Sequence, residues 1–150
     1  MPLKDKQQNP PQHCPRSKCA IANGLEILGD RWTLLIIRDL LFTNRNEFGH
    51  LLKSGEGIST NILTERLERL QCYGVIEKLP HPNHGRKFIY QLTDKGRGLA
   101  PVLIEFANWS KEALAGAFIP PPLDEMIQKD KKGLIQRVKK GETLFHLDLD

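Results

Sequence analysis

The sequence predicts a mainly α-helical protein (α+β) with a single two-stranded antiparallel hairpin. Apolar residues recur at three- and four-residue steps along most of the chain, which is the spacing of amphipathic helices. Two short stretches, residues 75–81 and 86–92, depart from this spacing and flank "PNHG", a loop of turn-forming residues. With 150 residues, of which 39% are hydrophobic and 27% charged, the chain has the size and composition of one globular domain.

The chain opens with a polar segment and two helices. Residues 1–13 contain three prolines, so we expect a mobile N-terminal arm. A first helix is expected within "CAIANGLEILGD", and Gly29 ends it. Asp30 suits the N-cap of a second helix, "DRWTLLIIRDLLF", whose apolar residues cover most of its surface. The second helix is therefore expected at the centre of the fold.

Two further helices follow a turn and a short extended piece at "TNRNEF". "GHLLKSGEG" predicts a short helix closed by glycines. A fourth helix is expected from Ser59 to about Tyr73, and Gly74 suits the left-handed stop after it. The apolar stripe of this helix consists of Ile62, Leu63, Leu67 and Leu70. Its opposite face carries Asn61, Thr64, Glu65 and Glu68.

The chain after the hairpin is predicted to be helical as far as a run of prolines. Thr93 suits the cap of a long last helix, and Pro101 inside it predicts a kink near Gly98. Residues 120–122 are all proline and are expected to stop this helix abruptly. A mixed-charge amphipathic segment follows, and the final "TLFHLDLD" fits an extended conformation.

Positive charge is concentrated around the hairpin. The whole chain has a net charge of +4, whereas residues 120–150 balance six bases against six acids. Residues 78–97 hold five bases and a single acid, Asp94. This local excess indicates a polyanionic partner more strongly than the total charge does.

Composition and motifs exclude several other classes of protein. Three cysteines without a cluster of Cys or His argue against a disulfide framework and a zinc site. No apolar run is long enough to span a membrane or resembles a signal peptide, so we expect a cytoplasmic protein. Since no Ser-His-acid set, phosphate-binding glycine loop or paired metal ligands appear, we expect neither an enzyme nor a cofactor.

The fourth helix has an unusual front of short polar side chains: Ser59, Thr60, Asn61 and Thr64. A helix that enters the DNA major groove must offer short donors and acceptors near its N-terminus. Its unpaired backbone N–H groups also favour a phosphate there. The alternative is that Ser59 or Thr60 merely caps the helix while Asn61 and Thr64 face solvent.

The hairpin loop supplies the second half of a DNA-binding unit. A narrow loop with cations can lie along phosphates or over the minor groove, and this loop carries His84, Arg86 and Lys87. A metal site at His81 and His84 is the weaker interpretation. Short helix, turn, polar-fronted helix and basic hairpin together predict a winged helix-turn-helix with a two-stranded wing.

Three further arginines could bind a phosphate or a neighbouring acid. Arg66 projects near the apolar stripe, where it either ion-pairs with a nearby acid or clamps a phosphate. Arg69 lies between the two faces and could pair with Glu65 along the helix. Arg45, at the start of the third helix region, is a candidate phosphate contact.

Five motifs resemble the HxlR-type regulators, a branch of the winged-helix regulators related to MarR. They are Cys14-Pro15, "LGDRWTLLIIRDLL" at 28–41, Phe48 with "GIS" nine residues on, "LTERLERLQCYGVIEK" at 63–78 and "YQLTDKGRGLAPVL" at 90–103. The resemblance covers roughly residues 14–115 in the family's order and spacing, and Arg45 matches a basic position of the family.

The resemblance implies a homodimeric bacterial transcription factor that binds an inverted repeat in double-stranded DNA. Each fourth helix would lie in a major groove and each wing on the flanking minor groove. Dimerisation would use residues 18–29 and the long C-terminal dimerisation helix at 94–115. We therefore divide the chain into an arm (1–13), a winged-helix DNA-binding and dimerisation domain (14–119) and a C-terminal extension (120–150). The extension would strap the dimer or bind a partner.

The resemblance also implies a regulatory thiol at Cys14 that senses an oxidant or a small electrophile such as a quinone or aldehyde. Arg16 and Lys18 lie close in sequence and would favour the reactive thiolate. The alternative is a packing role for Cys14. Cys19 is either a resolving partner or a buried small residue, and we favour burial; Cys72 is expected to be structural. Two other functions stay open: a protein-interaction module, and a regulator controlled by a small ligand at the dimer interface.

Overall fold

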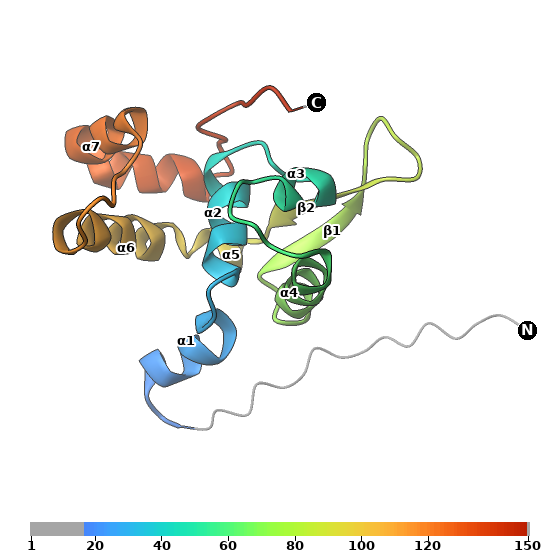
Figure 1. Ribbon diagram of the computed structural model, residues 1–150, viewed down its shortest axis with the longest axis horizontal. Helices are drawn as coiled ribbons and strands as arrows, with labels where there is room; N and C mark the ends of the chain where they lie inside the picture. Colours follow the sequence, from blue (N-terminus) through green and yellow to red (C-terminus); the bar gives the residue numbers. More distant parts are fainter. Residues whose placement is uncertain (1–16, 150) are drawn as a thin grey trace, which may run out of the picture.

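The computed structural model describes residues 17–149, which form a mainly helical fold with one two-stranded antiparallel sheet. This architecture, shown in Figure 1, confirms the predicted fold class. Its first four helices are α1 (Ala20–Leu28), α2 (Thr33–Phe42), α3 (Phe48–Leu52) and α4 (Thr60–Cys72). The hairpin of β1 (Ile76–Pro80) and β2 (Phe88–Leu92) is followed by α5 (Asp94–Arg97), α6 (Ala100–Ala113) and α7 (Pro121–Lys139).

Helix α2 lies at the centre of the fold, as its apolar sequence predicted. Ile37 is fully buried, and Ile36 and Leu41 are nearly so. The helix begins three residues later than the predicted cap, at Thr33. Asp30 still serves its N-terminus, because its Oδ1 accepts hydrogen bonds from the backbone N–H groups of Trp32 (2.9 Å) and Thr33 (3.1 Å). A carboxylate at this end also interacts favourably with the positive end of the helix dipole.

Helix α4 has the predicted bounds. Ser59 is its N-cap, with Oγ accepting from the backbone N–H of Ile62 at 3.3 Å. Leu63, Leu67 and Leu70 are almost completely buried. Gly74 follows the helix with φ of 70°, the left-handed conformation that glycine adopts without a steric cost.

The hairpin pairs Ile76 with Leu92 and Pro80 with Phe88, so residues 81–87 form its loop. Within the loop, the N–H of His81 donates to the carbonyl of Lys87 at 2.9 Å. The extended piece before α3 adds a further contact, since the N–H of Tyr90 donates to the carbonyl of Asn46 at 2.7 Å. The α2–α3 loop and the hairpin are thereby joined.

The predicted long last helix is broken into α5 and α6. Thr93 caps the short α5, because its Oγ1 accepts from the N–H of Gly96 at 3.2 Å. Helix α6 starts at Ala100 with Pro101 in its first turn, where the missing N–H costs nothing. The kink expected near Gly98 is therefore a helix boundary.

The proline run does not end α6, which corrects a second expectation. Helix α6 stops at Ala113, and Gly116 follows with φ of 82°. Pro121 and Pro122 instead occupy the first turn of α7. Proline suits this position because its fixed φ matches the helix.

The C-terminal extension packs on its own domain. Helix α7 lies beside α6 (Figure 1), and it bends at Asp130, whose φ and ψ are −156° and 77°. Its buried side chains join the single hydrophobic core: Leu123, Ile127, Leu134 and Val138. The tail then returns to the end of α2, where the N–H of Phe145 donates to the carbonyl of Phe42 at 2.9 Å. Asn44 makes two hydrogen bonds with the backbone of Leu147.

Among residues 17–149, no helix has the length and apolar character needed to cross a membrane.

Candidate DNA-binding surface

The front of α4 presents exposed polar side chains. Asn61 and Thr64 are both exposed, as are Ser59 and Thr60. Part of this polarity is used within the helix, since the Ser59 hydroxyl caps it and the Thr64 hydroxyl donates to the carbonyl of Thr60 at 2.9 Å. The capping interpretation therefore applies to Ser59. The amide of Asn61 and the acceptor lone pairs of Thr64 face solvent and could contact bases.

The hairpin loop carries exposed cations. His84, Arg86 and Lys87 are all exposed, and Arg86 forms no ion pair with any residue in the range 17–149. The rings of His81 and His84 lie 4.7 Å apart. No group of three potential metal ligands occurs within the described range.

Glu47, just before α3, ties the loop to the rest of the unit. One of its carboxylate oxygens lies 3.2 Å from Lys87 Nζ, and the other lies 3.3 Å from His81 Nε2. Burial would raise the pKa of Glu47, but the Lys87 hydrogen bond and the nearby His50, Lys87 and His81 hold it below its ordinary value. Lys87 is thus partly neutralised, which leaves Arg86 as the freer cation of this loop.

Some of the five basic side chains at residues 78–97 are engaged by other groups of the protein. Lys95 Nζ donates to the carbonyl of Tyr73 at the end of α4, at 2.7 Å. Arg97 donates to the carbonyls of Leu92 (2.6 Å) and Lys139 (3.1 Å). Lys78 Nζ lies over the ring of Phe88, 4.3 Å from its centroid. Lys95 and Arg97 therefore bind backbone carbonyls of the fold, whereas the exposed Arg86 of the hairpin loop makes no ion pair within residues 17–149.

Arg45 lies in the α2–α3 loop and not in α3. Its backbone N–H donates to Thr43 Oγ1 at 3.2 Å. Its charge also reaches Asp39, whose side chain is 4% exposed. Burial raises the pKa of Asp39, and the charges of Arg38 and Arg45 offset part of that rise.

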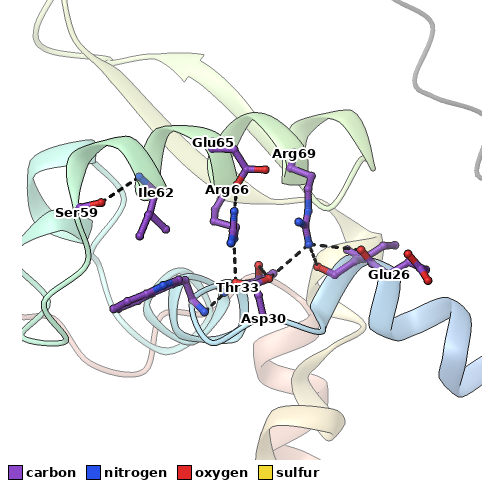
Figure 2. Close-up of polar contacts among 10 residues, drawn as sticks. Glu26, Asp30, Thr33, Ser59, Ile62, Glu65, Arg66 and Arg69 are labelled. Carbon is purple, nitrogen blue, oxygen red and sulfur yellow. Dashed lines mark hydrogen bonds and ion pairs between the residues drawn. The ribbon is translucent and has the colours of Figure 1, made fainter.

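Arg66 and Arg69 both turn inward from α4 to Asp30 (Figure 2). Arg66 Nε lies 2.9 Å from Asp30 Oδ1, and Arg66 also pairs with Glu65. For Arg69, a pair with Glu65 was one possibility, and the structure shows other partners. Arg69 Nη2 instead donates to the carbonyl of Ile27 at 2.8 Å and lies 3.4 Å from Asp30 Oδ2. For Arg66, the structure therefore supports the ion-pair interpretation over the phosphate clamp.

This cluster perturbs the titration of Asp30. Burial alone would raise its pKa, but hydrogen bonds from the Thr33 hydroxyl, from Arg66 and from the backbone of Trp32 and Thr33 lower it from 3.8 to about 2. The sequence pointed only to a helix cap at Asp30. No local pattern indicates its two arginine partners, which are 36 and 39 positions away.

Two apolar faces lie exposed on helices outside the DNA-binding unit. Helix α1 has no buried residue, and Ile21 and Leu25 are 75% and 58% exposed. On α6, Val102, Phe106 and Trp109 share one face and are each about half exposed. Apolar side chains grouped on a surface mark an interaction site. These faces belong to the segments that the resemblance assigned to dimerisation.

The cysteines differ from expectation. Cys14 lies outside the described residues. Cys19 is exposed at the N-cap of α1, so its predicted burial is wrong. Helix α1 packs on the core only at its other end, through Ile27 and Leu28. Cys72 is exposed as well, at the last position of α4, so a structural packing role is not supported.

Comparisons with known proteins agree with this geometry. Residues 27–117 match the model of the HxlR-like helix-turn-helix family. The chain is 33% identical to the HTH-type transcriptional regulator YvaP of Bacillus subtilis over 111 residues, which cover 74% of this chain and 98% of YvaP. The chain therefore belongs to the HxlR-like helix-turn-helix family and is a helix-turn-helix transcriptional regulator, not an enzyme.

Solved structures give the same result. The structure of PA1607 superimposes with a TM-score of 0.61 at 36% identity and covers 70% of each chain. The reduced form of the transcriptional regulator YodB from B. subtilis gives a TM-score of 0.55 at 30% identity, over 66% of this chain and 97% of YodB. A diamide-treated form of YodB gives 0.51 at 31% identity, over 63% and 94%.

Proposed function

We propose that this protein is a sequence-specific regulator that binds, as a homodimer, an inverted repeat in double-stranded DNA. One observation carries the proposal: α4 is capped by Ser59, presents Asn61 and Thr64 to solvent, and packs beside a hairpin whose loop carries Arg86. Helix α4 would enter the major groove and the hairpin would act as the wing over the flanking minor groove. The proposal places the protein in the bacterial cytosol, at the nucleoid.

The residues divide between base and backbone contacts. Asn61 and Thr64 would contact base edges, because their polar groups lie exposed on the outer face of α4. The free N–H groups at Ser59 and Thr60 suit a phosphate at the helix N-terminus. His84, Arg86 and Lys87 would contact phosphates along the wing, and Arg45 is a weaker candidate because it serves Asp39.

The dimer would form through the exposed apolar faces of α1 and α6. Support comes from Ile21 and Leu25 on one helix and from Phe106 and Trp109 on the other, all more than half exposed. Helix α7 covers a different side of α6 and leaves these side chains open. The C-terminal extension is thus compatible with the dimer.

Salt dependence tests DNA binding against the protein-interaction alternative. The probe is the inverted repeat that the protein selects from a library of random duplexes, named here the selected operator. Its affinity should fall by about 10³–10⁵ between 50 and 200 mM salt if about six to ten phosphates are neutralised. A library that yields no enriched repeat, or binding that barely responds to salt, would contradict the proposal.

We also propose that Cys14 is the thiol through which an oxidant or electrophile controls DNA binding. Support comes from the family resemblance, and the related YodB has been studied in reduced and diamide-treated forms. Cys19 and Cys72 are both exposed, so they compete for reagent within the same molecule. Mass spectrometry after diamide treatment should show Cys14 modified first. An unchanged diamide response of DNA binding in Cys14→Ser would end the sensor proposal and leave the DNA-binding proposal intact.

A further inference from the structure

We propose that Asp30, Arg66 and Arg69, named here the α1–α4 clamp, fix the half-site spacing that the dimer accepts in its operator. The three side chains join the end of α1 to the middle of α4. They are positioning residues, because they act on DNA through the orientation of α4. The inference rests on the proposed function. It adds that the clamp residues determine which half-site spacing the dimer prefers.

The clamp is a polar attachment of α1 to the DNA-binding unit. Helix α1 has no fully buried side chain and packs on the core only through its last turn, where Ile27 and Leu28 are partly buried. Figure 1 shows the rest of the helix projecting from one side of the fold. Its last-turn carbonyls at Glu26 and Ile27 accept from Arg69 Nη2 at 3.4 and 2.8 Å. Arg69 thus acts as a C-terminal cap of α1 that is supplied by α4.

Asp30 holds both arginines of the clamp at once. Its carboxylate receives Arg66 at 2.9 Å on one oxygen and Arg69 at 3.4 Å on the other, and the two arginines lie one turn apart on α4. The Thr33 hydroxyl donates to the same carboxylate at 2.5 Å, which fixes its orientation. The Asp30 and Arg66 side chains are only about one-fifth exposed, so solvent screens this pair less than a surface pair.

Half-site spacing depends on such an attachment. In the proposed dimer, α1 contacts the partner while α4 reads DNA, so the angle between α1 and α4 helps set the separation of the two α4 helices. One extra base pair between half-sites moves them apart by about 3.4 Å and rotates them by about 35°. If the clamp fixes the orientation of α4, the dimer loses affinity for the altered spacing. Without the clamp, each α4 can reorient to follow its half-site.

The test measures affinity for the selected operator and for versions with one or two base pairs added to or removed from its centre. Arg69→Met keeps the apolar stem and removes the guanidinium. It should reduce the preference for the original spacing by about fivefold or more, the lower range of coupling between sites. The matched control is Arg137→Met, which removes an exposed arginine of α7 that pairs with Glu142. This variant should keep the wild-type preference.

A geometric readout separates the clamp from DNA binding itself. Cys72 is exposed at the end of α4, so a spin label there, with Cys14 and Cys19 replaced by serine, reports the distance between the two α4 helices of the dimer. The distance distribution should broaden in Arg69→Met and in Asp30→Asn, and stay narrow in Arg137→Met. Thermal unfolding confirms that each variant is folded, and Arg69→Lys replaces any variant that is not.

The outcomes are distinct. A spacing preference and a distance distribution unchanged in folded Arg69→Met would overturn the clamp and leave the proposed function standing. A wild-type protein with no spacing preference, or with no dimer, would overturn the proposed function and the clamp with it.

Discussion

At the scale of single residues, the exposed front of α4 and the wing loop perform different tasks. Asn61 lies on the outer face of α4, and an amide can make a two-point contact with one base. Arg86 lies in a loop and forms no ion pair within residues 17–149, which suits a phosphate contact. Base contacts specify a sequence, whereas phosphate contacts hold any sequence.

The first prediction separates these tasks. Asn61→Ala and Thr64→Ala should each weaken binding to the selected operator by about 1–3 kcal/mol and leave binding to random duplexes nearly unchanged. Arg86→Ala should weaken binding to both duplexes about equally. It should also lower the slope of log affinity against log salt concentration by about 1. Fluorescence anisotropy on both duplexes measures each effect. Equal losses on random DNA from all three variants would contradict the division.

The second prediction concerns the pH dependence that Asp30 gives to stability. Its pKa is lowered in the fold from 3.8 to about 2, so the ionised form is favoured by folding. The gain, about 2 kcal/mol, is complete above pH 4 and is lost as the pH falls through 2. Urea unfolding at pH 5 and pH 3, at one protein concentration, should therefore show a smaller difference for Asp30→Asn than for the wild type. Equal differences would mean that the hydrogen bonds from Thr33, Arg66 and the backbone of Trp32 do not stabilise the carboxylate.

At the scale of elements, local sequence signals predicted the ends of several helices. They could not predict contacts between distant parts of the chain. The bounds of α4 and the stop at Gly74 depend on local sequence, and both were predicted correctly; the cap at Ser59 had been left as one of two interpretations. Pro101 and the prolines at 120–122 are also local, yet proline both ends and begins helices, and only packing decides which.

The candidate site follows the same rule. Exposure of Asn61 and Arg86 could be predicted because it follows from helical and turn spacing. The partners of Arg69 could not, since Asp30 lies 39 positions away. The return of the tail to α2 joins Asn44 to Leu147 across 103 positions, and nothing in the composition of the extension points to that contact.

The third prediction tests whether the C-terminal extension is part of the domain. Leu134 on α7 is 2% exposed within a single chain, so Leu134→Ala should lower the free energy of unfolding by about 2–5 kcal/mol. Leu114→Ala, at a side chain that is 50% exposed, is the matched control and should cost well under half as much. Urea unfolding measures both. A small change in the free energy of unfolding for Leu134→Ala would show that α7 does not pack stably on the core. That result would favour a segment that binds a partner.

At the scale of the whole molecule, the exposed apolar faces and the DNA-binding unit occupy different elements. Helices α1 and α6 carry the former, and α3, α4 and the hairpin carry the latter. A second chain can therefore cover the apolar faces without blocking α4 or the wing. Such a two-fold assembly presents two reading helices at a fixed separation, which matches the symmetry of an inverted repeat.

The fourth prediction follows from this separation of surfaces. Phe106 is 55% exposed on α6, and Phe106→Glu should leave the chain folded while it places a charge in the proposed interface. Burial of an unpaired carboxylate costs several kcal/mol, so the dimer should weaken by about a hundredfold or more. Sedimentation equilibrium measures this loss, and thermal unfolding reports whether the chain stays folded.

Phe88→Glu provides the control, because Phe88 is 48% exposed on the hairpin and lies away from α6 in sequence and in the fold. It should keep the dimer even if it weakens DNA binding. Phe106→Glu should lose affinity for the selected operator and keep the much weaker affinity for one isolated half-site, since each monomer retains its own α4 and wing. If Phe106→Glu stays dimeric, the partner chain must sit on another face, and the separation of the two α4 helices would have to be set elsewhere.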